Sequence, residues 1–515
     1  MQLVDHLTLG FSTAFTAVDV VCLVVGTLLG LAAALLPRFG PLAVMALLLP
    51  CVGSLGPTPT VILLAAVCAG ASQGRSLAAM LRPVAAPDAS QPAPMQSPLG
   101  MRTVGWMSAF AALAAGLLAW GLIALAAPVI TRLAFQFGPA EYAALMVLGL
   151  TCVVTLGSGS VLKAFAMAVL GLSLGLVGVD GGASSRFLQP AASPISSLWP
   201  LVFSDVDAIF PELGRGIPFV VLALGLFGLG QAMAQLDAAP AEERLPAPPA
   251  SAGARPTRLQ FWRSLPAVVR GSVVGGLLGL IPRGRALLAF FARDAAEPTD
   301  APMPDALQQT ALDAVAGVEA SRRAWSASSL VPLLTLGVPT GAATALLLGA
   351  MLWKHLRPGP QLMAAQPALF WGVIVAMALG AVMLVATSLA GHRLWQALQR
   401  VPYRVLYPAV VLWCALGAWV VDLSAFHVGL LAAVAVAGYV FSKLDCDVAP
   451  LLVGFVLAPL LETHVRGAFQ SEGQGWSGLV SHGLAAGLLG FSALLIMLSL
   501  LPSFRRRRRV ARELG

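Results

Sequence analysis

The sequence predicts an all-α, polytopic integral membrane protein of about 12 helices, with discontinuous or re-entrant helices and an internal two-fold repeat. Of its 515 residues, 58% are hydrophobic and only 10% are charged, whereas soluble globular domains carry about 25% charged residues. Apolar runs long enough to cross a bilayer as helices recur along the whole chain. The alternating pattern of a membrane β-barrel does not occur.

These apolar runs fall into two series. The first membrane repeat, predicted over 1–235, contains candidate spans near 17–36, 41–53, 58–71, 105–127, 141–156, 160–178 and 216–235. The second, over 268–502, contains spans near 268–281, 328–352, 368–390, 405–421, 424–441, 446–461 and 481–502. Residues 236–267 are rich in Pro, Ala and Arg, which predicts a solvated cytoplasmic linker.

The basic residues predict the orientation in the membrane. The net charge is +8, but the arginines lie mostly between apolar runs and in the tail 503–515. This is the positive-inside distribution, so we expect a cytoplasmic C-terminus and an outer N-terminus, and no nucleic-acid partner. The first residues lack a basic region and a cleavage pattern, so no cleaved signal peptide is expected. The sequence thus predicts a multi-pass protein with the lipid bilayer as its environment.

Neither catalysis nor a bound metal is expected from the reactive side chains. The six cysteines and six histidines show no metal-ligand spacing. No HExxH, Ser/His or paired-Asp constellation appears, and no phosphate-binding loop. We therefore expect no enzyme activity, no metal site and no cofactor.

An internal repeat is the strongest functional signal. Gly26, Gly30, Pro37 and Arg38 match Gly271, Gly275, Pro282 and Arg283 at a constant offset of 245 residues. The repeat continues loosely, because "GPTPTVILLAAVCAG" resembles "GVPTGAATALLLG" and each places Pro-Thr before an apolar helix.

Two interpretations of this repeat stay open. Paired helix breaks in the two halves of a transporter often form the substrate site, because broken helix ends expose unpaired N–H and C=O groups. Alternatively, Gly-xxx-Gly only lets helices pack closely and proline only kinks them. The repeat in register favours the site, whose further candidate residues are Gly40, Pro59, Thr60, Gly284, Gly337, Pro339 and Thr340.

The charged residues of the repeat also have two roles each. Arg38 and Arg283 would either clamp a carboxylate or cap a half-helix and reach the interface. Glu319, before a long apolar run, is expected at a helix N-terminus or paired with an arginine rather than on an ion. Arg285, Arg322 and Arg323 are expected in a loop or at the interface.

Landmarks along nearly the whole chain include, in this order, "GTLLGLAAALLPRFGPLAVMALLLPCVGSLGPTPT", "FGPAEY", "GVEASRRAWSASSLVPLLTLGVPTGAATALLLGA" and "VAPLLVGFVLAPLLETHVRGAF". With these landmarks the chain resembles the large permease subunit of tripartite tricarboxylate transporters. This chain departs from the family's Pro-Gly-x-Gly elements, which here read "PRFG" and "PRGR", from its Gly-Ile-Pro-Gly, here "GVPT", and from its Glu-Ala-x-Asn-Ala, here "EASRRA".

The resemblance implies a permease of the bacterial inner membrane that imports tricarboxylates or related organic acids by symport with Na⁺ or H⁺. It also implies two partners, a periplasmic solute-binding protein and a small membrane subunit of about four spans. The alternative is a diverged paralogue that acts as a membrane scaffold or transports a non-carboxylate solute.

Overall fold

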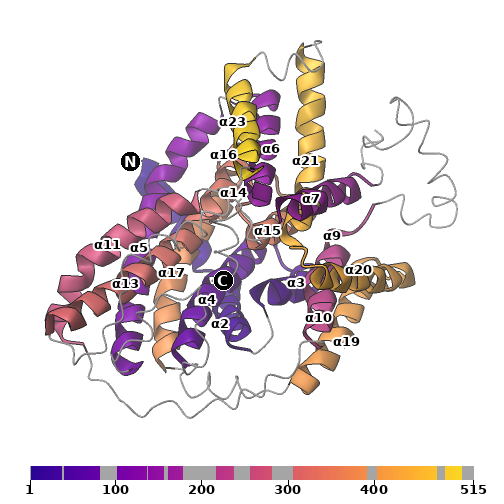
Figure 1. Cartoon of the computed structure of the whole chain (residues 1–515). Coiled ribbons are helices and arrows are strands. Elements are labelled where there is room, and N and C mark those ends of the chain that lie inside the picture. Colours follow the sequence, from indigo (N-terminus) through magenta and orange to yellow (C-terminus); the bar gives the residue numbers. More distant parts are fainter. Residues whose placement is uncertain are drawn as a thin grey trace, which may run out of the picture.

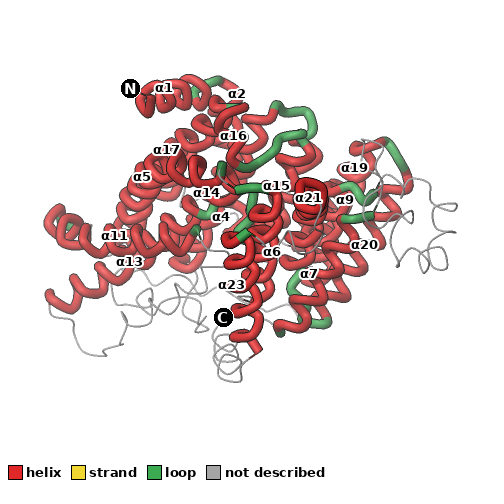
Figure 2. The backbone as a smooth tube through the Cα atoms, turned by 90° about the horizontal axis from the view of Figure 1, so that it is seen from above, coloured by secondary structure: helices red, strands yellow, loops and turns green. Residues whose placement is uncertain are grey.

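A computed structural model describes residues 2–36, 40–81, 101–135, 137–155, 160–177, 216–236, 256–280, 305–390, 403–472 and 482–500. Every regular element in these ranges is a helix. Six helices are long and apolar enough to cross a membrane, and six shorter apolar helices accompany them in the described part. The predicted all-α, polytopic membrane architecture is confirmed (Figures 1 and 2).

The helices follow one another in this order. The first half contains α1 (Gln2–Ala14), α2 (Ala17–Leu35), α3 (Pro41–Val52), α4 (Pro57–Leu81), α5 (Met101–Ala134), α6 (Pro139–Thr155), α7 (Val161–Gly175), α9 (Phe219–Ala223), the π-helix η4 (Leu224–Gly230) and α10 (Gln231–Leu236). The second half contains α11 (Arg258–Gly279), α13 (Asp305–Ser328), α14 (Leu330–Leu336), α15 (Ala342–Trp353), α16 (Pro360–Ala365), α17 (Pro367–Ala390), α19 (Tyr403–Asp422), α20 (Ala425–Lys443), α21 (Ala449–Glu472) and α23 (Gly483–Leu500).

Glycines let α2 pack backbone to backbone against α4. A Cβ on Gly26 would stand 2.5 Å from the carbonyl oxygen of Leu63, and one turn later Gly30 faces the carbonyl of Val67. Both residue numbers increase together, so α2 and α4 run parallel. The short helix α3 returns the chain between them.

The second half repeats this pair in α11 and α13, which lie side by side along α5 (Figure 1). Gly271 faces the carbonyl of Gly317, and Gly275 faces that of Ser321. The offset between equivalent glycines is 245 residues, and that between their partners is 254. We refer to α2 with α4 and α11 with α13 as the duplicated pairs.

The register of the duplicated pairs corrects one expectation. Thr60 lies in the first turn of α4, so its counterpart at the partner offset is Ala314 in α13. Thr340 instead precedes α15, which packs on α4, α3 and α21. The two Pro-Thr elements therefore do not occupy equivalent places, because their similarity reflects a shared way to start an apolar helix.

The apolar run 328–352, expected as one span, is two helices. Gly337 ends α14 with a φ of +73°, and α15 begins at Ala342 after an extended segment that contains Pro339. Glycine accepts the left-handed conformation without a Cβ penalty, and proline lacks the N–H that would continue the helix. A discontinuous helix is thus present in the second half.

Two helix boundaries also differ from expectation. The sequence does not predict α13 as a span, because polar and charged side chains interrupt its apolar residues, although one face of the helix is buried. The helix α11 begins at Arg258, so residues 258–267 of the expected linker are helical. A capping box between Thr257 and Gln260 fixes this start by satisfying two N–H groups.

The core lies around α15 and the segment from α9 to η4. Leu346, Leu348, Leu222 and Leu224 are fully buried there, and a Cβ on Gly349 would overlap the ring of Phe219. In contrast, large apolar side chains on α5, α19 and α23 are exposed, as expected where a helix faces lipid. The duplicated pairs flank this core on the side of α5 and α17.

Candidate functional site

Arg323 is a buried cation in the membrane domain. It lies in α13 with 6% of its surface exposed, whereas the sequence had indicated a loop or interface position. The expectation was wrong because Arg323 falls on the buried stripe of α13, which also carries Leu312, Ala316 and Ala320. Its neighbour Arg322 is half-buried. The helical period of these small and apolar residues was the signal that could have placed it.

The guanidinium of Arg323 is held by α4. Its Nη1 donates to the carbonyl oxygen of Ala69 at 3.0 Å and to the hydroxyl of Ser72 at 3.1 Å. Its Nη2 donates to Oε1 of Gln73. Three acceptors on one turn of a helix match the planar fork of an arginine side chain.

Ala69 and Arg323 are counterparts in the duplicated pairs. They are 254 residues apart, which is the offset of the helix contacts described above. Ser72 and Ser326 share this offset. Counterparts meet where two repeats contact each other about a pseudo-two-fold axis, which is the usual place of a transporter's binding site. The contact of Arg323 with Ala69 therefore joins the two duplicated pairs.

Glu319 is in the middle of α13, not at a helix N-terminus as one expectation had it. It is 1% exposed and precedes Arg323 by four residues, so the two share one helix face. The charge of Glu319 acts on the guanidinium of Arg323. The alternative expectation, an acid paired with an arginine, agrees with this placement.

A pocket opens beside Arg323. Its cavity volume is about 40 Å³, which suits only a very small solute, since one water molecule needs roughly 10–15 Å³. Its lining comes from α4, α5, α13, α14 and α17: Ala65, Cys68, Ala69, Gly116, Trp120, Arg323, Ser326, Ala327, Leu330, Met377, Ala381 and Leu384. Most of these side chains are small and apolar, so a guanidinium faces a largely apolar chamber.

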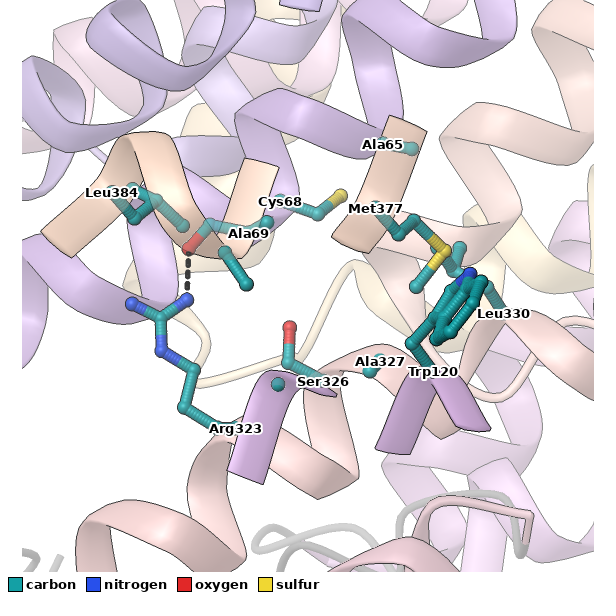
Figure 3. Close-up of a pocket in the computed structure, with 12 residues that line it drawn as sticks. Ala65, Cys68, Ala69, Trp120, Arg323, Ser326, Ala327, Leu330, Met377 and Leu384 are labelled. Carbon is teal, nitrogen blue, oxygen red and sulfur yellow. Dashed lines mark hydrogen bonds between the residues drawn. The ribbon is translucent and has the colours of Figure 1, made fainter. Parts of the chain in front are cut away.

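Hydrogen-bond donors are unused at this pocket. Nε of Arg323 and Nε1 of Trp120 are buried and have no acceptor among the described residues. Figure 3 shows Arg323 and Trp120 at opposite ends of the pocket residues, with the hydroxyl of Ser326 pointing into the space between them. Buried donors without acceptors are costly and rare, so this arrangement can receive a ligand that brings acceptors.

The four repeat glycines lie between helices. As described above, the carbonyls of α4 and α13 cover Gly26, Gly30, Gly271 and Gly275. This geometry matches the close-packing alternative that the sequence left open. Direct contact of these glycines with a ligand stays a prediction.

The candidates around α3 and α4 lie at helix starts. Gly40 is the N-cap of α3, and a Cβ there would stand 3.6 Å from the side-chain amide of Gln231. Pro59 and Thr60 lie in the first turn of α4, where the hydroxyl of Thr60 donates to the carbonyl of Gly56 at 2.8 Å. The hydroxyl of Thr60 therefore bonds back to a helix carbonyl, and contact of Pro59 or Thr60 with a ligand stays a prediction.

The candidates at the break between α14 and α15 are buried against protein. The hydroxyl of Thr340 donates to the carbonyl of Ser329 at 3.2 Å. A Cβ on Gly337 would stand 2.9 Å from the carbonyl oxygen of Pro358. Pro339 lies between them in the extended segment. The structure does not place any of these three residues in the lining of the Arg323 pocket.

The Pro-Arg breaks lie outside the described residues. These are Pro37 and Arg38 in the first copy and Pro282, Arg283 and Gly284 in the second. No group of three or more His, Cys, Asp or Glu side chains that could hold a metal ion occurs within the ranges that the structure describes.

Comparison with known proteins places the chain in a family. Residues 20–453 match the profile described as "Tripartite tricarboxylate transporter TctA family". The "Uncharacterized 52.8 kDa protein in TAR-I ttuC' 3'region" of Agrobacterium vitis is 36% identical over 514 residues, which cover 99% of this chain and 98% of the relative. The "Uncharacterized protein in TAR-II ttuC' 3'region" of the same organism is 38% identical over 234 residues, which cover 45% and 97%, respectively. No solved structure matches the chain. This protein belongs to the tripartite tricarboxylate transporter TctA family, a family of transporters.

Proposed function

We propose that the chain is the permease subunit of a binding-protein-dependent secondary transporter that imports tricarboxylates or related organic acids. It acts in the bacterial inner membrane, with its C-terminus in the cytoplasm, and is driven by a Na⁺ or H⁺ gradient. A periplasmic solute-binding protein delivers the acid, and a small four-span subunit completes the complex. Membership in the TctA family supports these partners, because the family's name describes a tripartite system.

The observation that carries the proposal is the buried guanidinium of Arg323 beside a pocket between two repeats. An ionisable side chain inside a membrane domain is expensive, so it marks a functional site by default. The charge of arginine persists at any physiological pH, so a carboxylate beside Arg323 would meet a cation whose terminal nitrogens are already oriented by α4. The Arg323 pocket therefore favours an organic acid as its solute.

The helix ends that precede the two Pro-Arg breaks pack against α4 and α13, the helices that hold Arg323. Ala34, three residues before Pro37, packs against Gly74, which directly follows the Gln73 that holds Arg323. In the second copy, Gly279 packs against Ser328, and Pro282 follows three residues later. We propose that Arg38 and Arg283 flank the pocket and receive the carboxylate as it enters or leaves.

Uptake of labelled citrate, malate and lactate tests this function. Cells would produce the chain together with its solute-binding protein and small subunit. We expect accumulation that depends on all three proteins and that stops when an ionophore collapses the Na⁺ or the H⁺ gradient. Arg323→Gln should lower the initial rate at least about tenfold, since a hydrogen bond to a charged group contributes about 1.5–3 kcal/mol.

Arg322→Gln is the matched control, because it removes the same charge one residue away on the half-buried side of α13. It should keep most of the uptake. Absence of three-component uptake of every acid tested, with all proteins present in the membrane, would instead favour the scaffold alternative.

A further inference from the structure

We propose that the Arg323 pocket binds an organic acid through a single carboxylate, so that this chain handles small monocarboxylates in preference to tricarboxylates. The inference rests on the proposed function, since it assumes that the transported solute is an organic acid. It narrows the substrate class beyond what the family's description states.

The charge of the pocket limits the ligand. Arg323 is the only charged residue among the described residues that line it. Glu319, one helical turn away and 1% exposed, already balances part of that charge. A second or third carboxylate would enter this pocket without a cationic partner. An uncompensated buried charge is strongly unfavourable even after the surroundings relax, which disfavours a trianion.

The remaining lining fits a compact apolar body. Ala65, Ala327 and Ala381 have only a methyl group, and Leu330 and Leu384 add apolar surface. Such a wall offers no hydrogen bonds to hydrated carboxylates. It favours the short carbon chain of a small acid, because removing apolar surface from water is favourable.

The donors define how the acid is oriented. At one end, the guanidinium of Arg323 supplies the positive charge for the carboxylate, and its Nε–H has no acceptor among the described residues. The hydroxyl of Ser326 points into the middle (Figure 3), and Nε1–H of Trp120 is free at the other end. A monocarboxylate with a hydroxyl or keto oxygen would satisfy donors at both ends. An acid that lacks this oxygen would leave the indole N–H without an acceptor.

Binding to the purified chain in detergent tests the inference without the partner proteins. Isothermal titration at neutral pH would use lactate, propionate, malate and citrate as probes. We expect saturable binding of lactate, about threefold or more weaker binding of propionate, and binding of citrate at least about tenfold weaker than that of lactate. These ratios follow from the loss of one neutral hydrogen bond and from an unpaired buried charge, respectively.

Four variants assign the binding to this pocket. Arg323→Gln should weaken lactate binding at least about tenfold, and Trp120→Phe about threefold, while Arg322→Gln leaves it unchanged. Arg323→Lys keeps the charge but loses the fork, so binding should fall to an intermediate value. If Arg323→Gln does not fold, Arg323→Lys and Trp120→Phe decide the same question.

The inference is overturned if citrate binds as tightly as lactate, if no acid binds, or if lactate binding is indifferent to Arg323 and Trp120. The proposed function fails separately. If the three-component system takes up citrate but the purified chain does not bind lactate, the inference is contradicted and the proposed function is supported. If lactate binds at Arg323 but no acid is taken up, the binding site is supported and the proposed transport function is contradicted.

Discussion

Arg323 donates a hydrogen bond of 3.0 Å to the backbone carbonyl of Ala69, its own counterpart in the other half of the chain. The bond joins α13 to α4 and thereby connects the two duplicated pairs. Each pair is locked internally by glycine contacts, whereas a pocket lies between the pairs. Close backbone packing thus lies within each pair, whereas the boundary between the pairs contains the polar groups and the pocket.

The first prediction concerns the glycines inside the duplicated pairs. Gly30→Val and Gly275→Val should each lower the free energy of unfolding by about 1–3 kcal/mol, because the new side chain meets the carbonyl of Val67 or Ser321. Thermal unfolding of the purified protein in detergent, followed by tryptophan fluorescence, measures the loss.

Gly121→Ala is the control for these variants, because no atom of the described residues lies within 4 Å of a Cβ at that position. It should be neutral or stabilising by up to about 1 kcal/mol, the helix propensity gained over glycine. Equal melting temperatures for all three variants would show that backbone contact in the duplicated pairs does not matter.

The second prediction concerns the break between α14 and α15. Gly337→Ala places a Cβ on a residue with a φ of +73°, at 2.9 Å from the carbonyl oxygen of Pro358. The left-handed conformation alone costs about 1–2 kcal/mol for a residue with a Cβ. We expect a lower melting temperature and less folded protein after gel filtration. In the same break, Gly341→Ala should be tolerated, since its φ is −179° and its surroundings are open.

The third prediction concerns Lys354, which connects the ends of two short helices. At the C-cap of α15, its Nζ donates to the carbonyls of Gly53 at 2.6 Å and Leu55 at 2.8 Å, just after α3 ends. Lys354→Met keeps the apolar stem but leaves these carbonyls without the cation. We expect a loss of about 1 kcal/mol in unfolding free energy. Lys354→Arg should recover part of this stability. An unchanged unfolding free energy for Lys354→Met would show that water replaces the ammonium group without loss of stability.

The fourth prediction concerns the two Pro-Arg breaks. In the sequence they follow the ends of α2 and α11 by two and three residues, respectively, and we propose above that both flank the Arg323 pocket. Cysteines at Arg38 and Arg283, in a background without other cysteines, should therefore be joined by a short bifunctional maleimide. A cysteine at Leu125, 64% exposed on α5, should not be joined to either. Failure of the Arg38–Arg283 pair under conditions that label both thiols would exclude a shared site.

The sequence by itself determined the membrane class and most of the apolar helices, and it contains the repeated glycine pattern, but it did not predict α13. Long apolar runs have few alternatives to a helix in a bilayer, because every backbone polar group must be satisfied internally. The offset between Gly26 and Gly271 is likewise visible without a structure, because both are glycines of a repeated pattern. The family could be inferred for the same reason, since its landmarks are local and keep their order.

Only the tertiary structure decided what these features contact. The open faces of Gly26 and Gly271 meet helix backbone, and Arg323 lies inside rather than at the interface. Burial of Arg323 depends on acceptors at Ala69, Ser72 and Gln73, some 250 residues away. Local patterns contain no information about such partners, because an arginine enters a membrane interior only where distant backbone and side-chain oxygens compensate its charge.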